Sequence, residues 1–421
     1  MDAQPFAFLA TNTVLQNKQI TDIMQEKTEV NFMIAIINAE LIMRDHLIPE
    51  AVLFIEDGKI AGYGEMRTTP IPEGCEIIDA EGSYVGPGLV DIHSHSGTGV
   101  RFIHDPVKAM EEHRECGTTS ILATPTTRAP EPAVYVEQIK GIREAMAVED
   151  SIIAGIYMEG PYINASFGSV TTKPGPGMPR VFEPVPEEYE PLFAAGADII
   201  RVWGTAPERE GIENFVKAAK AANPEVRFAV THSEATPQQI EALVPYGLCI
   251  GTHHTNATGT IVNYPECRGV CVDECVNYNN AIYAEVISDS MGIHVDPYMQ
   301  RLIRKIKGDD RIILISDQTV HEPLLIPGFE HVTDINLTYS PDGRLDISGS
   351  KLTLNVACRN WMKHTGASLV EAFKVASYNP AQAVGLKDRG EIRVGLKADL
   401  IFVDVKMNVS KVILNGKVVK G

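Results

Sequence analysis

The chain has 421 residues, a formal net charge of −18 at pH 7 and a hydrophobic content of 44 %. This length exceeds one ordinary domain, but a barrel with insertions plus a small accessory domain accounts for it. The negative charge argues against a nucleic acid or an anionic membrane as a partner, because the field of the protein repels polyanions. The N-terminal residues lack the pattern of a signal peptide and no apolar run is long enough to span a bilayer, so we expect a cytoplasmic protein without a membrane partner.

Both ends of the chain are predicted to be rich in short strands. Residues 33–64 and 399–417 contain apolar runs separated by tight turns, and the Asn-Gly pair at 415–416 is typical of a hairpin. A long segment with α/β patterning separates the two. We therefore expect one small β-sandwich that is assembled from both ends of the chain.

The middle of the chain alternates apolar runs with helical patterns, which indicates repeated βα units. About eight runs are candidate strands, the number that a closed (β/α)8 barrel needs. They are 89–92, 120–123, 152–158, 199–203, 228–230, 248–251, 284–287 and 312–315. We therefore predict an α/β fold with a TIM-like barrel in residues 87–390. Residues 1–86 would hold the N-terminal segment and the first part of the sandwich, and residues 391–421 its return strands.

Residue types that bind metals follow five of these strands. The carboxyl ends of all strands in such a barrel face the same mouth, where active sites lie. His93 and His95 come at the end of the first strand, and because they are two residues apart their side chains project from the same side of the chain. The four further positions are, in chain order, Glu159, His232, His253 and Asp317. Since chance explains this placement poorly, we predict a metal site at the mouth of the barrel.

The residue types also indicate the chemistry. Imidazoles with one carboxylate suit zinc or a similar divalent ion of the first transition row. Such an ion lowers the pKa of a bound water and polarises a substrate carbonyl. A carboxylate outside the ligand set can carry the proton from that water to the leaving group, and Asp317 is our candidate. The alternative is that Asp317 caps a helix, since Ser316-Asp317-Gln318-Thr319 is also a pattern that opens helices.

Short sequence motifs extend over nearly the whole chain. PGLVDIHSH at 87–95 and GLKADL at 395–400 are joined by MEGP at 158–161 and THHTNA at 252–257. Further motifs are GIHVD at 292–296, GSKLTL at 349–354 and ASYNPA at 376–381. Together they resemble the amidohydrolase superfamily and, within it, the N-acetylglucosamine-6-phosphate deacetylase family. MEGP together with THHTNA is the more discriminating pair.

The resemblance implies roles for the residues that could bind metal. Glu159, His232 and His253 would be the principal ligands of a divalent ion, expected to be zinc. His93 and His95 would complete a second metal position, and the sequence leaves open whether one or two ions bind. The fourth strand ends without the lysine that some relatives use as a bridge, so Glu159 would supply the bridging carboxylate.

The resemblance also implies a proton carrier and a substrate site. Asp317 would deprotonate the metal-bound water and then protonate the departing amine. Asn256 and Ala257 would offer groups to the substrate phosphate, and His294 would help to bind the sugar phosphate. The alternatives are that Asn256 is only a turn residue and that His294 is a surface histidine with satisfied hydrogen bonds.

The chain departs from the family pattern at two positions. The family has a histidine soon after MEGP that polarises the acyl carbonyl, and residues 162–173 contain none. The family also has an arginine a few residues after the NA pair that meets phosphate. The nearest arginine here is Arg268, which is displaced by the segment 258–267. Either a second metal ion polarises the acyl carbonyl in this chain, or the substrate differs from that of the family.

Our hypothesis is a metal-dependent deacetylase that hydrolyses N-acetylglucosamine 6-phosphate to glucosamine 6-phosphate and acetate. The nearest alternative is an amidohydrolase for another N-acylated sugar, such as N-acetylgalactosamine 6-phosphate, or for an N-acyl amino acid. A catalytically silent metal-bearing scaffold or sugar-binding protein is disfavoured by Asp317, because binding alone needs no proton carrier. We expect a homodimer, since relatives form dimers with sites near the interface and symmetric dimers are the commonest oligomers.

Overall fold

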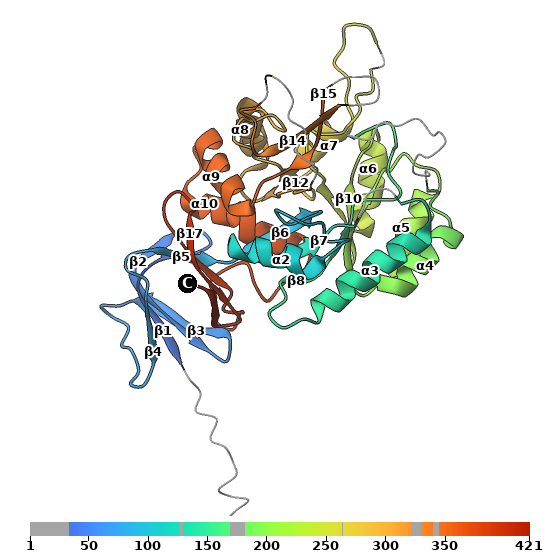
Figure 1. The fold of residues 1–421 in the computed structure, drawn as a ribbon. Helices are drawn as coiled ribbons and strands as arrows, with labels where there is room; N and C mark the ends of the chain where they lie inside the picture. The colour runs from blue at the N-terminus through green and yellow to red at the C-terminus, as the bar shows by residue number, and fades with distance from the viewer. Residues whose placement is uncertain are drawn as a thin grey trace, which may run out of the picture.

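The structure is a computed structural model that describes residues 33–125, 129–168, 182–262, 264–320, 328, 330–339 and 345–421. A barrel surrounded by helices forms the larger part, and a sheet made from both ends of the chain lies beside it (Figure 1). In the part that is described, we find no helix with the length and apolar character needed to cross a membrane.

The barrel sheet contains eight parallel strands that follow one another in chain order. They are β6 (Leu89–Ser94), β7 (Thr118–Ala123), β8 (Ile153–Met158), β9 (Ile200–Thr205), β10 (Arg227–Val230), β11 (Leu248–Gly251), β12 (Tyr283–Val286) and β13 (Ile312–Leu314). Each predicted strand is found within one or two residues of its expected position. The prediction of a TIM-like barrel is confirmed.

The ends of the barrel sheet meet through the residues that follow β6 and β13. The amide of Asp317 donates to the carbonyl of His93 at 3.0 Å, and the amide of His95 donates to the carbonyl of Gln318 at 2.9 Å. These bonds join the first and last strands at their carboxyl ends. The backbone that closes the barrel is therefore the backbone that carries three of the predicted site residues.

Helices cover the outside of the barrel, and several begin with proline after a residue that caps the helix. Proline suits this position because its fixed φ is helical and its missing N–H would have had no partner there. The helices are α2 (Pro106–Glu115), α3 (Pro132–Met146), α4 (Pro186–Gly196), α5 (Ile212–Ala222), α6 (Pro237–Leu243), α7 (Val272–Tyr278), α8 (Pro297–Lys307), α9 (Leu354–Thr365), α10 (Leu369–Phe373) and α11 (Asn379–Ala383). Their apolar faces and the strands form one core around the fully buried Trp203, Phe215 and Trp361.

The smaller sheet has eight strands and draws them from both ends of the chain, as predicted. Its strands are β1 (Ile34–Ile42), β2 (Leu47–Glu56), β3 (Lys59–Glu65), β4 (Glu76–Asp79), β5 (Tyr84–Pro87), β16 (Leu400–Val403), β17 (Val409–Leu414) and β18 (Lys417–Lys420). The order is β18-β17-β16-β5-β1-β2-β3, with β4 paired to β1. Since β5 belongs to this sheet and β6 to the barrel, we keep the proposed domain boundary next to Pro87.

A hairpin between β13 and α9 supports the mouth of the barrel. It consists of β14 (Ile335–Tyr339) and β15 (Leu345–Ser350), and Ser350 at its end bonds to the backbone after β13. The amide of Ser350 donates to the carbonyl of Asp317, and the amide of Thr319 donates to the carbonyl of Ser350, both at 2.9 Å. The hairpin therefore fixes the backbone position of Asp317.

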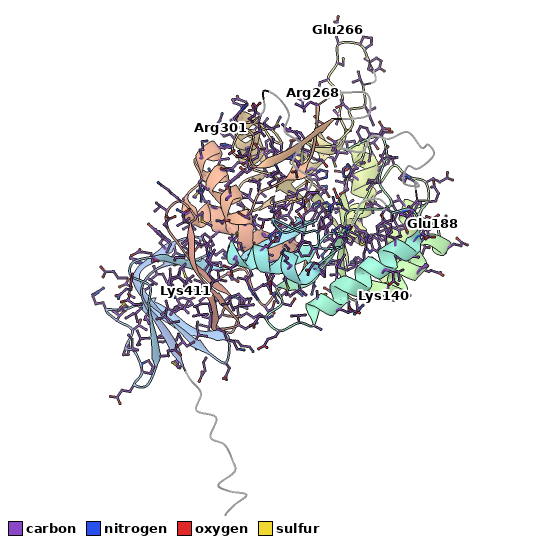
Figure 2. All side chains as sticks on the ribbon, in the orientation of Figure 1. Lys140, Glu188, Glu266, Arg268, Arg301 and Lys411 are labelled. Carbon is purple, nitrogen blue, oxygen red and sulfur yellow. The ribbon has the colours of Figure 1, made fainter. Side chains whose placement is uncertain are left out.

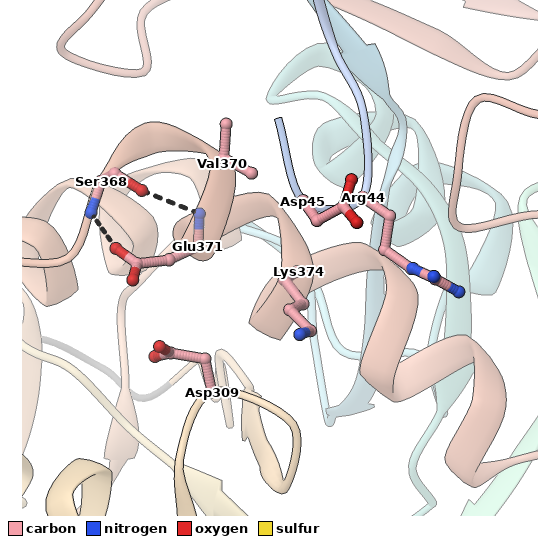
Figure 3. A pocket seen from close by; sticks show the side chains of 7 residues that line it. All are labelled: Arg44, Asp45, Asp309, Ser368, Val370, Glu371 and Lys374. Carbon is pink, nitrogen blue, oxygen red and sulfur yellow. Dashed lines mark hydrogen bonds between the residues drawn. The ribbon is translucent and has the colours of Figure 1, made fainter. Parts of the chain in front are cut away.

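A pocket opens where the small sheet meets the barrel (Figure 3). It is lined by Arg44, Asp45, Asp309, Ser368, Val370, Glu371 and Lys374. Asp309 precedes β13, so this pocket lies at the amino ends of the strands, opposite the mouth. Its charges are largely paired: Arg304 binds both Asp309 and Glu371 at 2.7 Å. Nothing in its lining resembles the predicted metal site.

Candidate metal centre

Six side chains converge at the carboxyl ends of five strands, as the spacing of their motifs predicts. They are His93 and His95 at the end of β6, Glu159 directly after β8, His232 two residues after β10, His253 two residues after β11 and Asp317 three residues after β13. The side chain of Asp317 is 11 % exposed, and those of the other five are between 0 % and 11 % exposed. The site is therefore almost closed to solvent.

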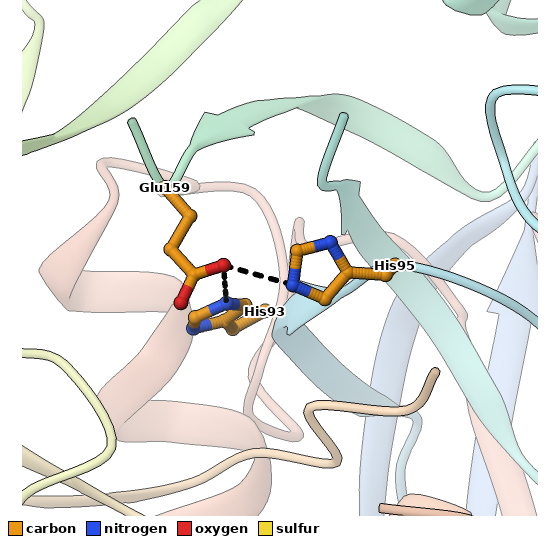
Figure 4. Close-up of side chains that lie close together, drawn as sticks. All are labelled: His93, His95 and Glu159. Carbon is orange, nitrogen blue, oxygen red and sulfur yellow. Dashed lines mark ion pairs between the residues drawn. The ribbon is translucent and has the colours of Figure 1, made fainter. Parts of the chain in front are cut away.

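The carboxylate of Glu159 is the centre of the cluster. Its Oε2 atom lies 2.9 Å from Nε2 of His95 and 3.7 Å from Nε2 of His93 (Figure 4). Its Oε1 atom lies 2.9 Å from Nε2 of His232 and 3.1 Å from Nε2 of His253. Each carboxylate oxygen thus faces its own pair of histidines.

The nitrogen and oxygen atoms of this cluster are donors that suit a divalent metal ion. The trio His93, His95 and Glu159 and the trio Glu159, His232 and His253 each offer three ligand atoms within 4.8 Å of one another. Nε2 of His93 is buried and makes no hydrogen bond among the described residues, although carboxylate oxygens of Glu159 and Asp317 lie 3.7 and 3.8 Å away, and an ion between these groups would satisfy it. Nδ1 of His95 lies 3.1 Å from the carbonyl of Pro125, a contact that turns Nε2 of this ring toward Glu159.

The electrostatics of the cluster reflect its burial. Burial by itself raises the pKa of the Glu159 carboxyl, but the charge of His93 and the hydrogen bonds from His232 and His253 hold it well below its usual range. Burial lowers the pKa of His93, while the adjacent Glu159 and Glu285 carboxylates outweigh burial and raise it well above its usual range. Without an ion, protonated imidazoles are therefore the counter-charges of Glu159. A divalent ion would replace those protons.

Asp317 lies beside the cluster and does not open a helix. Its Oδ1 atom is 3.5 Å from Nε2 of His95 and 3.8 Å from Nε2 of His93. The residues from Gln318 to Val320 are not helical, so the alternative role as a helix cap is wrong. The carboxylate is within reach of a small molecule that contacts the two histidines. This is the position that a proton carrier needs.

Three of the site residues share an unusual backbone conformation. His232 has φ +43°, His253 has φ +30° and Asp317 has φ +44°. Residues other than glycine rarely adopt positive φ, and such conformations cluster at functional sites because the surrounding structure must impose them. The strand ends after β10, β11 and β13 therefore turn in the same strained way to place these residues at the mouth.

The residues below the cluster were not predicted from the sequence. The ring of Tyr157 stacks on the His93 ring with a centroid distance of 4.6 Å, and its hydroxyl bonds to Thr252 at 2.6 Å. Glu285 is fully buried, and its Oε2 atom lies 3.3 Å from Nδ1 of His93. The signal for Glu285 was available, because it is a charged residue inside the predicted strand 284–287.

The predicted substrate residues are only partly brought together. Nδ2 of Asn256 donates to the carbonyl of His294 at 2.9 Å, so the loops that follow β11 and β12 meet. Ala257 lies in the same loop with φ +54°. Arg268 projects from a long loop at the top of the molecule and is 83 % exposed (Figure 2). Its guanidinium is paired with Glu274 at 3.0 Å, and the structure does not place it with the other site residues.

Comparison with known proteins gives one consistent family. Residues 84–419 match the model of the amidohydrolase family. N-acetylglucosamine-6-phosphate deacetylase of Lysinibacillus sphaericus is 26 % identical over 382 residues, which are 87 % of this chain and 92 % of that protein. N-acetylgalactosamine-6-phosphate deacetylase of Escherichia coli O157:H7 is 28 % identical and covers 90 % of this chain and 97 % of its own length. The crystal structure of N-acetylglucosamine-6-phosphate deacetylase from Pasteurella multocida superposes with a TM-score of 0.76 at 25 % identity, over 93 % of this chain and all of that chain. The resemblance stated from the motifs is confirmed.

The raised pKa of His93 predicts how the metal-free protein responds to pH. A group whose pKa is higher in the folded state stabilises the fold below its unfolded pKa, about 6.5 for histidine, and loses that contribution as pH rises through the folded value. We expect the melting temperature of the metal-free protein to fall at alkaline pH. Added Zn²⁺ should remove this dependence, because the ion replaces the protons. Thermal melts with and without chelator test this, and equal alkaline losses in both forms would contradict it.

Substitution of Gly349 is expected to displace Asp317. A Cβ atom at Gly349 would lie 2.8 Å from the carbonyl oxygen of Asp317, and φ is +62°. Gly349→Ala should lower kcat about tenfold to a hundredfold while metal content stays normal, because small misplacements of catalytic groups are costly. Gly366→Ala is the matched control, since Gly366 has φ +73° and no heavy atom within 4 Å of the new Cβ. Equal kcat for both variants would rule out the proposed displacement.

Proposed function

Because this chain belongs to the amidohydrolase family, we propose that it is a metal-dependent deacetylase of amino-sugar phosphates. Its proposed substrate is N-acetylglucosamine 6-phosphate, which it converts to glucosamine 6-phosphate and acetate. The observation that carries the proposal is the placement of Glu159 between two pairs of histidines with Asp317 beside them. This arrangement supplies ligands and a separate carboxylate for proton transfer, and both are needed to hydrolyse an amide.

The proposed mechanism assigns a task to each group. His93, His95, Glu159, His232 and His253 would hold one or two divalent ions, for which we propose zinc. An ion bound there supplies a Lewis acid for the acyl carbonyl and lowers the pKa of the attacking water. Asp317 accepts the proton of that water through its carboxylate and then donates it to the amine nitrogen as the C–N bond breaks. The nearly closed mouth excludes bulk water and so strengthens these interactions.

We propose that the loops after β11 and β12 hold the sugar phosphate. Asn256 and His294 support this role because their bond joins the two loops beside His253. Ala257 would offer its backbone N–H. Arg268 would have to leave Glu274 to reach a phosphate at the mouth, so its assignment rests on the sequence pattern alone.

The second candidate is N-acetylgalactosamine 6-phosphate as substrate. The curated relative with this activity is 28 % identical to the chain, compared with 26 % for the glucosamine enzyme of Lysinibacillus sphaericus. The chain also lacks the carbonyl-polarising histidine of the family between residues 162 and 173. The two sugars differ only in the orientation of one hydroxyl, so the same metal centre serves either.

Acetate release by the zinc-loaded protein tests the proposed function. We expect kcat/KM for N-acetylglucosamine 6-phosphate to exceed that for the unphosphorylated sugar by more than roughly a hundredfold, about 2.7 kcal/mol of transition-state binding. N-acetylgalactosamine 6-phosphate, measured in parallel, distinguishes the two candidate substrates. Comparable rates with and without phosphate would contradict the phosphosugar assignment, and no acetate from any of these sugars would contradict the deacetylase assignment.

Asp317→Asn tests the proton carrier. The substitution keeps the size of the side chain but removes its ability to accept a proton. We expect kcat to fall about 100-fold to 10,000-fold, the usual contribution of general acid–base catalysis, while metal content stays unchanged. Metal content by elemental analysis and steady-state kinetics are the measurements. A variant that keeps its metal and full activity would exclude this role.

We also propose a cytoplasmic homodimer. All seven cysteines are free thiols, which supports a reducing compartment. The exposed apolar side chains Tyr298, Leu302 and Ile306 repeat every fourth residue along α8, which supports an interface there.

Light scattering after gel filtration should give twice the chain mass of 46.0 kDa. Leu302→Glu should shift it to the monomer, and Val405→Glu, in the exposed turn between β16 and β17, should not. A monomeric wild type would contradict the dimer.

A further inference from the structure

A buried acid outside the predicted ligand set touches both halves of the metal centre. Glu285 lies in β12, is fully buried, and its neighbours Ala284 and Val286 pair with β13. Its Oε2 atom lies 3.3 Å from Nδ1 of His93. The same atom accepts a hydrogen bond from the amide of His253 at 3.2 Å. One carboxylate oxygen therefore contacts a residue of each trio.

The contact with His93 decides which nitrogen of that ring faces the cluster. A carboxylate next to Nδ1 favours a proton on Nδ1, and the lone pair of the neutral ring is then on Nε2. Nε2 is the atom that lies 3.7 Å from Glu159 and 3.8 Å from Asp317. The ring of Tyr157 stacks on the His93 ring and holds the plane of that ring. Glu285 thus presents Nε2 of His93 in the form that binds a metal.

The contact with His253 acts on the backbone. His253 has φ +30°, and such a conformation persists only where surrounding bonds impose it. The amide of His253 is held by the Glu285 side chain, and the next amide, of His254, donates to the Glu285 carbonyl at 2.7 Å. Both bonds come from one residue. The strained turn after β11 is therefore attached to β12 at Glu285.

The metal-free fold satisfies only one oxygen of this carboxylate. A buried carboxylate is costly unless its oxygens are fully hydrogen-bonded, and among the described residues Oε1 of Glu285 has no hydrogen-bond partner. Its other oxygen, Oε2, is compensated by His93 and by the amide of His253, so half of the carboxylate is satisfied in the metal-free fold. Its negative charge becomes favourable when a cation is bound close by.

We propose that Glu285 is a positioning residue for the metal centre, which orients His93 and His253 and couples the two trios. The inference rests on the proposed metal-dependent function, but it is independent of the identity of the substrate. Glu285 itself binds no ion and touches no substrate. It acts through the two histidines, and its negative charge lowers the energy of the ion-bound state.

Metal binding to the metal-free protein is the direct test. Glu285→Gln keeps an acceptor near Nδ1 of His93 but removes the charge, and Glu285→Ala removes both. We expect Zn²⁺ affinity, measured by competition with a chelator, to fall about tenfold in the first variant and toward a hundredfold in the second. Asp399→Asn is the matched control, because Asp399 is a buried carboxylate in the small-sheet region that bonds to the amide of Asn415. Its Zn²⁺ affinity should equal that of the wild type.

Thermal melts provide a second readout. We expect metal-free Glu285→Gln to melt at a lower temperature than the wild type, because the ion pair with His93 is lost, and its gain in melting temperature on adding Zn²⁺ to be smaller as well. A residue with only a structural role would lower the metal-free melting temperature and leave Zn²⁺ affinity unchanged. That result would overturn the proposal, as would wild-type affinity in both Glu285 variants.

A double-variant cycle tests whether Glu285 acts through His93. In a His93→Ala background, Glu285→Gln should lose most of its effect on Zn²⁺ affinity, because the ring that it orients is gone. A full effect in that background would overturn the assigned role. These measurements also separate the inference from the proposed activity. Zn²⁺ binding that depends on Glu285 without acetate release would contradict only the deacetylase, and deacetylation with unchanged Zn²⁺ affinity in the variants would contradict only the inference.

Discussion

The buried carboxylate of Glu159 is the constraint on which the site depends. A carboxylate almost removed from water needs a charged or hydrogen-bonding partner at each oxygen, and each oxygen of Glu159 faces a pair of imidazoles. The four histidines come from three different strands, so the charge is balanced only when the barrel is closed. The barrel must therefore close for the candidate metal site to form, and an ion bound there would stabilise both the site and the closed barrel.

The same backbone that closes the barrel carries His93, His95 and Asp317, to which we assign the chemistry. The residues after β6 and β13 exchange hydrogen bonds, and the hairpin of β14 and β15 adds two more next to Asp317. This arrangement leaves little freedom for the carboxylate relative to His93 and His95. It explains why a motif as distant as GSKLTL belongs with the site: its glycine and serine pack against the backbone of Asp317.

Some groups beside the centre destabilise the fold when no ion is bound. Glu285 is a fully buried acid whose Oε1 has no hydrogen-bond partner among the described residues, and three residues at the strand ends have strained positive φ values. Such features lower the stability of a metal-free barrel and are retained where they orient ligands. A bound cation reverses part of this cost by interacting with the carboxylates. Metal binding and folding are thus expected to be thermodynamically linked in this protein.

The sequence by itself determined the barrel, its eight strands and the residue types at five strand ends, because hydrophobic periodicity and strand-end position are local properties. It also determined the family, since motifs such as MEGP and THHTNA are contiguous. Only the tertiary structure decided which atoms meet: that each oxygen of Glu159 faces one histidine pair, that Glu285 lies behind His93, and that Arg268 is paired with Glu274 outside the mouth. Ring orientation, ion pairing and backbone strain arise from contacts between segments far apart in the chain, and no local pattern records them.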